Sequence, residues 1–144
     1  MGEIKAINIS RVRGTRKETV PQVTLIEGYG LEGDAHAGSW HRQVSLLSYE
    51  AFQDFEERGA GVVPGDFGEN LLVSGFDFKN LPVGTRFRSG EVLLEMTQIG
   101  KECHAGCDIF KRMGDCIMPR EGVFAVVLRG GVLREGDPFE LVTD

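Results

Sequence analysis

The chain has 144 residues, a length typical of one domain, so we expect residues 1–144 to form a single unit. Its net charge of −6 argues against nucleic acids and anionic membranes as partners. No apolar run approaches the roughly 20 residues that a membrane-spanning helix needs, and no secretory apolar region follows Met1. The sequence therefore predicts a cytoplasmic protein without a nucleic-acid or membrane partner.

The 20 glycines are spread along the chain and predict many tight turns between short strands. A helix is expected at residues 49–58, capped by Ser48, stopped by Gly59 and facing the core with Phe52 and Phe55. A second, short helix is expected at residues 108–113. Apolar alternation predicts strands at residues 3–10, 22–27, 43–47, 70–73, 85–88, 92–98, 123–128 and 139–142.

One short pattern occurs twice. Residues 81–87 and 133–139 share the form L-x-x-G-[T/D]-x-F, and each copy leads into a predicted strand. Similar corners recur around a closed barrel, although two glycine turns can also coincide by chance. The fold class predicted is mostly β: a closed or partly open β-barrel with one or two short helices.

The segment with the most chemistry follows the strand predicted at residues 92–98 and contains Cys103. Lys101 and His104 lie within two residues of it, and positive neighbours favour the thiolate, the form that attacks, carries sulfur or binds a soft metal. The alternative is a small buried cysteine without chemistry. A zinc site using Cys103, His104, Cys107 and Cys116 is a weaker alternative, because no C-x-x-C pair is present.

Four further segments contain polar residues suited to a ligand. Asp34 and His36 lie two apart in a glycine-rich stretch, where they could orient a ligand or only tie down the loop. Asn70 could read the edge of a heterocycle or cap a turn. Arg120 could bind an anion or form a surface ion pair, and the basic loop at residues 11–17 could bind a phosphate or be a solvated hairpin end.

The chain contains no nucleotide-binding P-loop, G-x-G-x-x-G, G-x-S-x-G or H-E-x-x-H motif. Nucleotide hydrolysis and serine hydrolase chemistry thus lack support. The odd number of cysteines, 3, favours free thiols in a reducing compartment.

Taken together, the segments resemble one family, the MOSC domains, named after the C-terminal domain of molybdenum cofactor sulfurase. Five motifs occur in the family's order, and the resemblance extends from about position 10 to 137. The motifs are residues 30–38 (G-x-x-G-D-x-H-A-G), 42–45 (R-Q-V-S), 68–71 (G-E-N-L), 97–104 (T-Q-I-G-K-x-C-H) and 119–124 (P-R-E-G-V-F).

The resemblance implies a barrel fold and a functional cysteine at Cys103, acting with His104. That cysteine would carry sulfur as a persulfide or ligate molybdenum held by a pterin. The expected cofactor is molybdenum cofactor (molybdopterin), and no pyridoxal phosphate is expected on this chain. The implied cofactor-binding residues are Lys17, Asp34, His36, Arg42, Asn70, Lys101 and Arg120.

The sequence leaves three hypotheses of function open. The first is cofactor sulfuration or assembly, with a cysteine desulfurase and a molybdoenzyme or cofactor-assembly protein as partners. The second is a molybdenum-dependent reductase of N-hydroxylated compounds that needs partner proteins. The third is a non-catalytic binding or regulatory barrel. No role is assigned to Cys107 or Cys116.

Overall fold

The computed structural model describes residues 2–12, 17–35, 37–65, 67–100 and 122–142. Short strands are the main secondary structure of these residues, as the glycine pattern predicts. The strands are β1 (Gly2–Ile9), β2 (Glu18–Val20), β3 (Gln22–Ile26), β4 (Gly30–Leu31), β5 (Val44–Ser48), β6 (Leu71–Ser74), β7 (Arg86–Ser89), β8 (Val92–Ile99), β9 (Val123–Arg129), β10 (Gly131–Arg134) and β11 (Pro138–Leu141).

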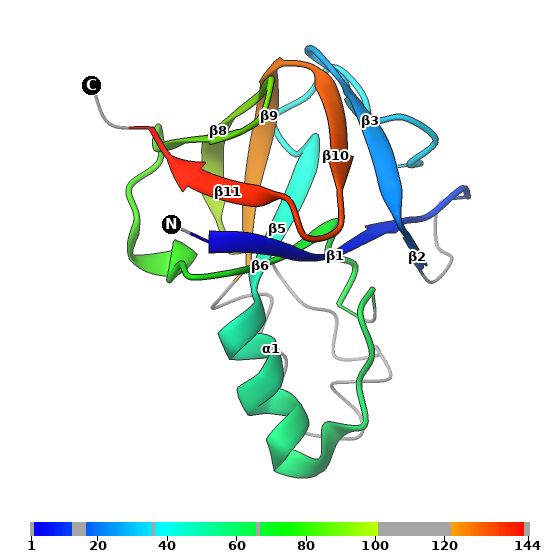
Figure 1. Ribbon diagram of the computed structural model, residues 1–144, viewed down its shortest axis with the longest axis vertical. Coiled ribbons are helices and arrows are strands. Elements are labelled where there is room, and N and C mark those ends of the chain that lie inside the picture. Colours follow the sequence, from blue (N-terminus) through cyan, green and yellow to red (C-terminus); the bar gives the residue numbers. More distant parts are fainter. Residues whose placement is uncertain (1, 13–16, 36, 66, 101–121, 143–144) are drawn as a thin grey trace.

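Seven of the strands close into a barrel. They follow the order β11-β7-β8-β9-β5-β6-β1, and β1 pairs back onto β11 through Gly2 opposite Phe139 and Glu3 opposite Pro138. The strand β2 extends this sheet from β1, and β10, β3 and β4 form a second sheet of three strands. Figure 1 shows this second sheet beside the barrel. The predicted β-barrel is confirmed, and it is closed.

The helix lies in the connection between two neighbouring strands. Helix α1 (Tyr49–Phe55) follows β5, continues as a π-helical turn η1 (Glu56–Ala60), and the chain returns to β6, which is parallel to β5. A parallel pair needs such a crossover, because a hairpin cannot join strands of the same direction. Figure 1 shows α1 projecting from one end of the barrel. Ser48 caps it as predicted, accepting a hydrogen bond from the backbone N–H of Ala51.

The buried apolar side chains form two clusters, one on each face of the barrel strands. Alternate residues of β6 show the division: Leu71 and Val73 belong to the cluster inside the barrel, whereas Leu72 packs with the helix outside it. Phe52 and Phe55 are buried as predicted, but in the outer cluster, where both rings meet Phe67 edge to face. The helix is therefore held by a small core of its own, on the outer face of β5 and β6.

The repeated pattern forms the same turn twice. Thr85 donates its backbone N–H to the Pro82 carbonyl, and Asp137 donates to the Arg134 carbonyl in the same way. The two copies lead into β7 and β11, which pair with each other. Their phenylalanines, Phe87 and Phe139, meet in the barrel with ring centroids 5.2 Å apart.

The structure adds elements that the sequence does not predict. These are β2, β4, β10 and a 3-10 turn η2 (Phe78–Asn80), all of them two to four residues long. The helix ends earlier than residue 58, because the last turn widens before Gly59, which has a φ of 85°. The helix predicted at residues 108–113 lies outside the described residues. In the part of the chain that the structure describes, no helix is long and apolar enough to span a membrane.

Candidate functional site

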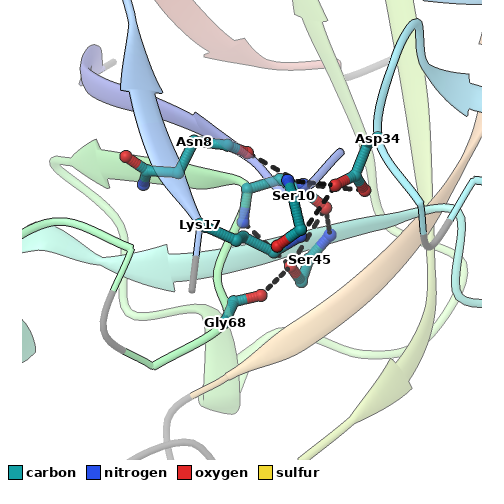
Figure 2. Close-up of polar contacts among 7 residues, drawn as sticks. Asn8, Ser10, Lys17, Asp34, Ser45 and Gly68 are labelled. Atoms are coloured by element: carbon teal, nitrogen blue, oxygen red, sulfur yellow. Dashed lines mark hydrogen bonds and ion pairs between the residues drawn. The ribbon is translucent and has the colours of Figure 1, made fainter. Parts of the chain in front are cut away.

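A buried ion pair joins two loops beside the barrel. The Lys17 ammonium lies 2.8 Å from Asp34 Oδ1, and the two side chains are 3% and 0% exposed. The same Asp34 oxygen accepts the backbone N–H of Ser10 at 2.9 Å. Figure 2 shows Ser10 and Lys17 beside the Asp34 carboxylate, with dashed lines to its oxygen atoms. Two predicted ligand residues, Lys17 and Asp34, thus meet, and each neutralises the charge of the other.

Asn70 extends this network to the barrel wall. Its Nδ2 donates to Asp34 Oδ2 at 3.2 Å and to the Asn8 carbonyl at 3.0 Å. Its Oδ1 accepts the backbone N–H of Ser45 at 2.9 Å and lies 3.1 Å from the Ser45 hydroxyl. Both amide hydrogens and the amide oxygen of Asn70 thus have partners inside the protein. A role in reading a ligand stays a prediction.

Glu69, next to Asn70, has a role that sequence reasoning missed. It is fully buried, and its carboxylate accepts the backbone N–H groups of Gly65 at 2.9 Å and Phe67 at 3.1 Å. The loop held in this way packs against the first segment of the site, because a Cβ on Gly65 would lie 2.8 Å from the Lys17 carbonyl oxygen. The short G-E-N-L motif therefore ties the loop at 65–68 to the buried ion pair.

A row of outward-facing residues leads from this network to a second polar group. Ser45 of β5 is opposite Phe124 of β9, which is in turn opposite Gln98 of β8. Phe124 faces outward, because its neighbours Val123 and Ala125 belong to the cluster inside the barrel. The network around Asp34 and the group around Gln98 therefore lie along one row of the barrel wall.

The second group contains Arg42, the remaining predicted ligand residue that the structure describes. Its Nε donates to Gln98 Oε1 at 3.1 Å, and its guanidinium carbon lies 5.1 Å from the centroid of the Phe124 ring. His41 Nε2 is 2.7 Å from the same Gln98 oxygen. Within the described residues, neither Nη nitrogen of Arg42 has a hydrogen-bond partner. The guanidinium is thus held at one edge while its other donors remain for a ligand.

Gln98 also marks where the cysteine-bearing segment leaves the barrel. Its Nε2 donates to the Gly100 carbonyl at 2.8 Å, and the Gly100 N–H donates to the Gly122 carbonyl at 2.6 Å. The two residues that flank the segment 101–121 are therefore joined at the end of β8 and the start of β9. The predicted residues Lys101, Cys103, His104 and Arg120 lie outside the described residues, as does His36.

The zinc alternative also falls on that segment, since Cys103, His104, Cys107 and Cys116 all lie outside the described residues. Among the described residues, no three histidine, cysteine, aspartate or glutamate side chains gather as candidate metal ligands.

The sequence matches the MOSC domain family over residues 33–140, and the chain belongs to that family. The family is associated with molybdenum cofactor, so this is a molybdenum-cofactor-related MOSC protein in that general sense. No curated protein matches the chain by sequence.

Solved structures agree on the fold. YuaD from Bacillus subtilis is 20% identical, with a TM-score of 0.79 over 98% of this chain and 96% of its own. YiiM from Geobacillus stearothermophilus is 22% identical, with a TM-score of 0.75 over 99% of this chain and 76% of its own. YiiM from Escherichia coli is 25% identical, with a TM-score of 0.64 over 99% and 70%.

The described residues fit one part of a pterin cofactor, its phosphate. A guanidinium forms paired hydrogen bonds to phosphate oxygens, and Arg42 keeps two nitrogens for such a contact. Within the described residues, no acidic side chain pairs with the Arg42 guanidinium. Its one hydrogen bond there goes to the neutral Gln98.

Proposed function

We propose that the protein binds molybdenum cofactor at the end of β8 and the start of β9, and handles sulfur or molybdenum there through Cys103. The observation that carries the proposal is the position of Arg42. Its oriented guanidinium shares Gln98 with Gly100, the last described residue before the segment that contains Cys103. A cation suited to a phosphate thus lies near the origin of the segment with the candidate nucleophile.

In this proposal each residue has a simple task. Arg42 binds the phosphate of the pterin, and Lys101 and Arg120 add positive charge from the two ends of the segment 101–121. The network of Lys17, Asp34 and Asn70 fixes the loops beside the site. When bound, the cofactor supplies molybdenum, a metal to which a soft thiolate can bind.

As a sulfur carrier, Cys103 would act by thiol–disulfide chemistry. Its thiolate attacks the outer sulfur of a donor persulfide, such as that of a cysteine desulfurase. A new S–S bond forms on Cys103 while the S–S bond of the donor breaks, and the donor leaves as a thiolate. Neither an oxidant nor a reductant is consumed, because one persulfide replaces another.

The proposal is tested by loading the purified protein. The wild type, Cys103→Ser and the control Cys107→Ser are incubated with a cysteine desulfurase and L-cysteine, or with isolated molybdenum cofactor. We expect the wild type and Cys107→Ser to gain a sulfur atom or to retain molybdenum, and Cys103→Ser to do neither. If Cys103→Ser loads as well as the wild type, Cys103 is not the functional group.

A loss of sulfur uptake alone identifies a carrier, and a loss of molybdenum alone identifies a cofactor-binding protein with Cys103 as ligand. The reductase reading then requires, in addition, turnover of an N-hydroxylated compound by the loaded protein with an electron-donor partner. If the wild type loads neither sulfur nor molybdenum, the proposal fails, and a non-catalytic barrel is favoured.

A further inference from the structure

We propose that Gln98 is the positioning residue of this site, and that it fixes Arg42 and His41 as one preorganised pair. The inference deepens the proposed function and rests on it for the identity of the ligand. It concerns two residues, Gln98 and His41, to which neither the sequence nor the family resemblance assigns a role.

The orientation of the Gln98 amide follows from its neighbours. Arg42 Nε can only donate, so the atom 3.1 Å from it must be the amide oxygen. The Gly100 carbonyl can only accept, so the atom 2.8 Å from it must be the amide nitrogen. The reverse orientation would place donor against donor and acceptor against acceptor. The amide therefore has one permitted orientation.

This orientation also determines which ring nitrogen of His41 carries the proton in the hydrogen bond to Gln98. Its Nε2 lies 2.7 Å from the Gln98 oxygen, which has only lone pairs to offer, so Nε2 must carry a proton. In the neutral ring the remaining nitrogen, Nδ1, is then the acceptor. The His41 backbone is held as well, because its carbonyl accepts the hydroxyl of Thr97 on β8.

A single oxygen thus holds two side chains that are consecutive in the sequence. Phe124 also holds Arg42 in place, since the guanidinium lies over the face of its ring. The two Nη nitrogens of Arg42 have no hydrogen-bond partner among the described residues and remain as donors for an anion, whereas the His41 Nδ1, an acceptor in the neutral ring, is not such a donor. Fixing donors before the ligand arrives removes an ordering cost from binding, so Gln98 should raise the affinity for an oxyanion.

Three variants test this role. Gln98→Ala removes both halves of the amide. Gln98→Glu keeps an acceptor for Arg42 and His41, but it loses the donor to Gly100 and neutralises Arg42 by its charge. The matched control is Gln53→Ala, which removes an exposed glutamine from α1. Gln98 is itself only half-buried at the end of β8, so its replacement should leave the barrel folded.

The first readout is the nitrogen-15 NMR signal of the Arg42 Nε–H group, compared with that of the exposed Arg129. We expect a restrained, slowly exchanging signal in the wild type, Gln98→Glu and Gln53→Ala, and loss of that restraint in Gln98→Ala. The ring nitrogens of His41 should show a protonated Nε2 in the wild type. A wild-type Arg42 signal like that of Arg129, or one unchanged in Gln98→Ala, overturns the proposal.

The second readout is the affinity for inorganic phosphate, followed through the same Arg42 and His41 signals. We expect about tenfold weaker binding in Gln98→Ala, because the Arg42 side chain must then be ordered when the anion binds. Binding in Gln98→Glu should weaken although Arg42 stays restrained. If Gln98 had only a structural role, the restraint of Arg42 and the phosphate affinity would change together in every variant. If phosphate leaves the Arg42 and His41 signals unchanged in the wild type, or binds Gln98→Ala equally well, Gln98 does not position an anion site.

These outcomes are independent of Cys103. If Cys103 takes up neither sulfur nor molybdenum while Gln98→Ala loses the Arg42 restraint and the phosphate affinity, the proposed function fails and the positioning role stands. If Cys103 loads normally but Gln98→Ala changes neither readout, the function stands and the positioning role is wrong.

Discussion

At the scale of single residues, Asp34 has the most demanding environment among the described residues. Its side chain is fully buried, and its two oxygens accept from Lys17, Ser10 and Asn70. Burying a charge is costly unless a partner of opposite charge and further hydrogen bonds compensate it. The pair therefore acts first on stability, by holding the loops that contain Ser10 and Lys17 against the barrel.

We expect Asp34→Asn to lower the free energy of unfolding by about 3–5 kcal/mol, since it removes the buried carboxylate that lies 2.8 Å from the Lys17 ammonium. Urea denaturation of both proteins measures the difference. The control is Glu140→Gln, which breaks the exposed pair with Arg88 and should cost less than about 1 kcal/mol. Equal effects of the two substitutions would show that the buried pair is not a stabilising link.

Arg42 gives a second prediction at this scale. A lysine at this position keeps the charge but has no Nε–H to donate to Gln98 while its ammonium contacts a ligand. We expect Arg42→Lys to bind inorganic phosphate about tenfold more weakly than the wild type, close to the effect of losing one charge-assisted hydrogen bond. Calorimetry or NMR titration measures it. Unchanged affinity would mean that charge alone, without orientation, accounts for anion binding.

Parts of the site could be predicted and parts could not, for physical reasons. The resemblance selected Lys17, Asp34, Asn70 and Arg42 from motifs, but not the contact between Lys17 and Asp34, which depends on two loops folding against the barrel. Gln98 belongs to a recognised motif, yet its contact with His41 spans 57 positions. Only the pairing of β8 with β9, and of β9 with β5, brings these residues together.

At the scale of elements, the longer strands are predictable because their apolar alternation extends over several residues. The strands β1, β3, β5, β8 and β9 lie where this pattern predicts them. By contrast, β2 and β4 are three and two residues long, too short for a period to show, and β10 has only one buried residue, Leu133, among its four. Their existence depends on partners elsewhere in the chain, such as β10 on β3.

The loop between α1 and β6 depends on one close approach. Gly65 and Gly84 have nearly the same φ, 95° and 98°, but only a Cβ on Gly65 would meet other atoms, the nearest being the Lys17 carbonyl oxygen at 2.8 Å. We expect Gly84→Ala to cost about 1 kcal/mol through backbone strain alone. Gly65→Ala should cost about 1–3 kcal/mol more, the range for forcing atoms into a packed site.

Thermal or urea unfolding of the two alanine variants checks this difference. The backbone strain is common to both substitutions, so the excess measures the contact between the loop and residue 17. Equal destabilisation would show that the loop moves away from Lys17 without loss.

At the scale of the whole molecule, the closure of the barrel depends on β11. This strand pairs with β7 on one side and with β1 on the other, and Phe139 packs its ring against Phe76, Phe78 and Phe87. The repeated pattern at residues 81–87 and 133–139 predicted two similar turns that lead into strands. It could not show that Phe87 and Phe139, one from each copy, pack against each other.

We expect Phe139→Ala to destabilise the protein by about 3–5 kcal/mol, as a large cavity in a closed core does. Leu141→Ala, in the same strand but 40% exposed, should cost less than about 1 kcal/mol. Chemical denaturation followed by circular dichroism measures both. A similar loss of stability in the two variants would contradict the view that the packing of the Phe139 ring, and not β11 as a strand, keeps the barrel closed.

The central claim is that Cys103 is the functional group of a protein that handles molybdenum cofactor. The most direct test is the intact mass and molybdenum content of the wild type and Cys103→Ser, both purified without reductant from cells that make the cofactor. We expect a labile additional sulfur atom, or bound molybdenum, in the wild type and neither in the variant. A Cys103→Ser protein that carries as much sulfur or molybdenum as the wild type would contradict it.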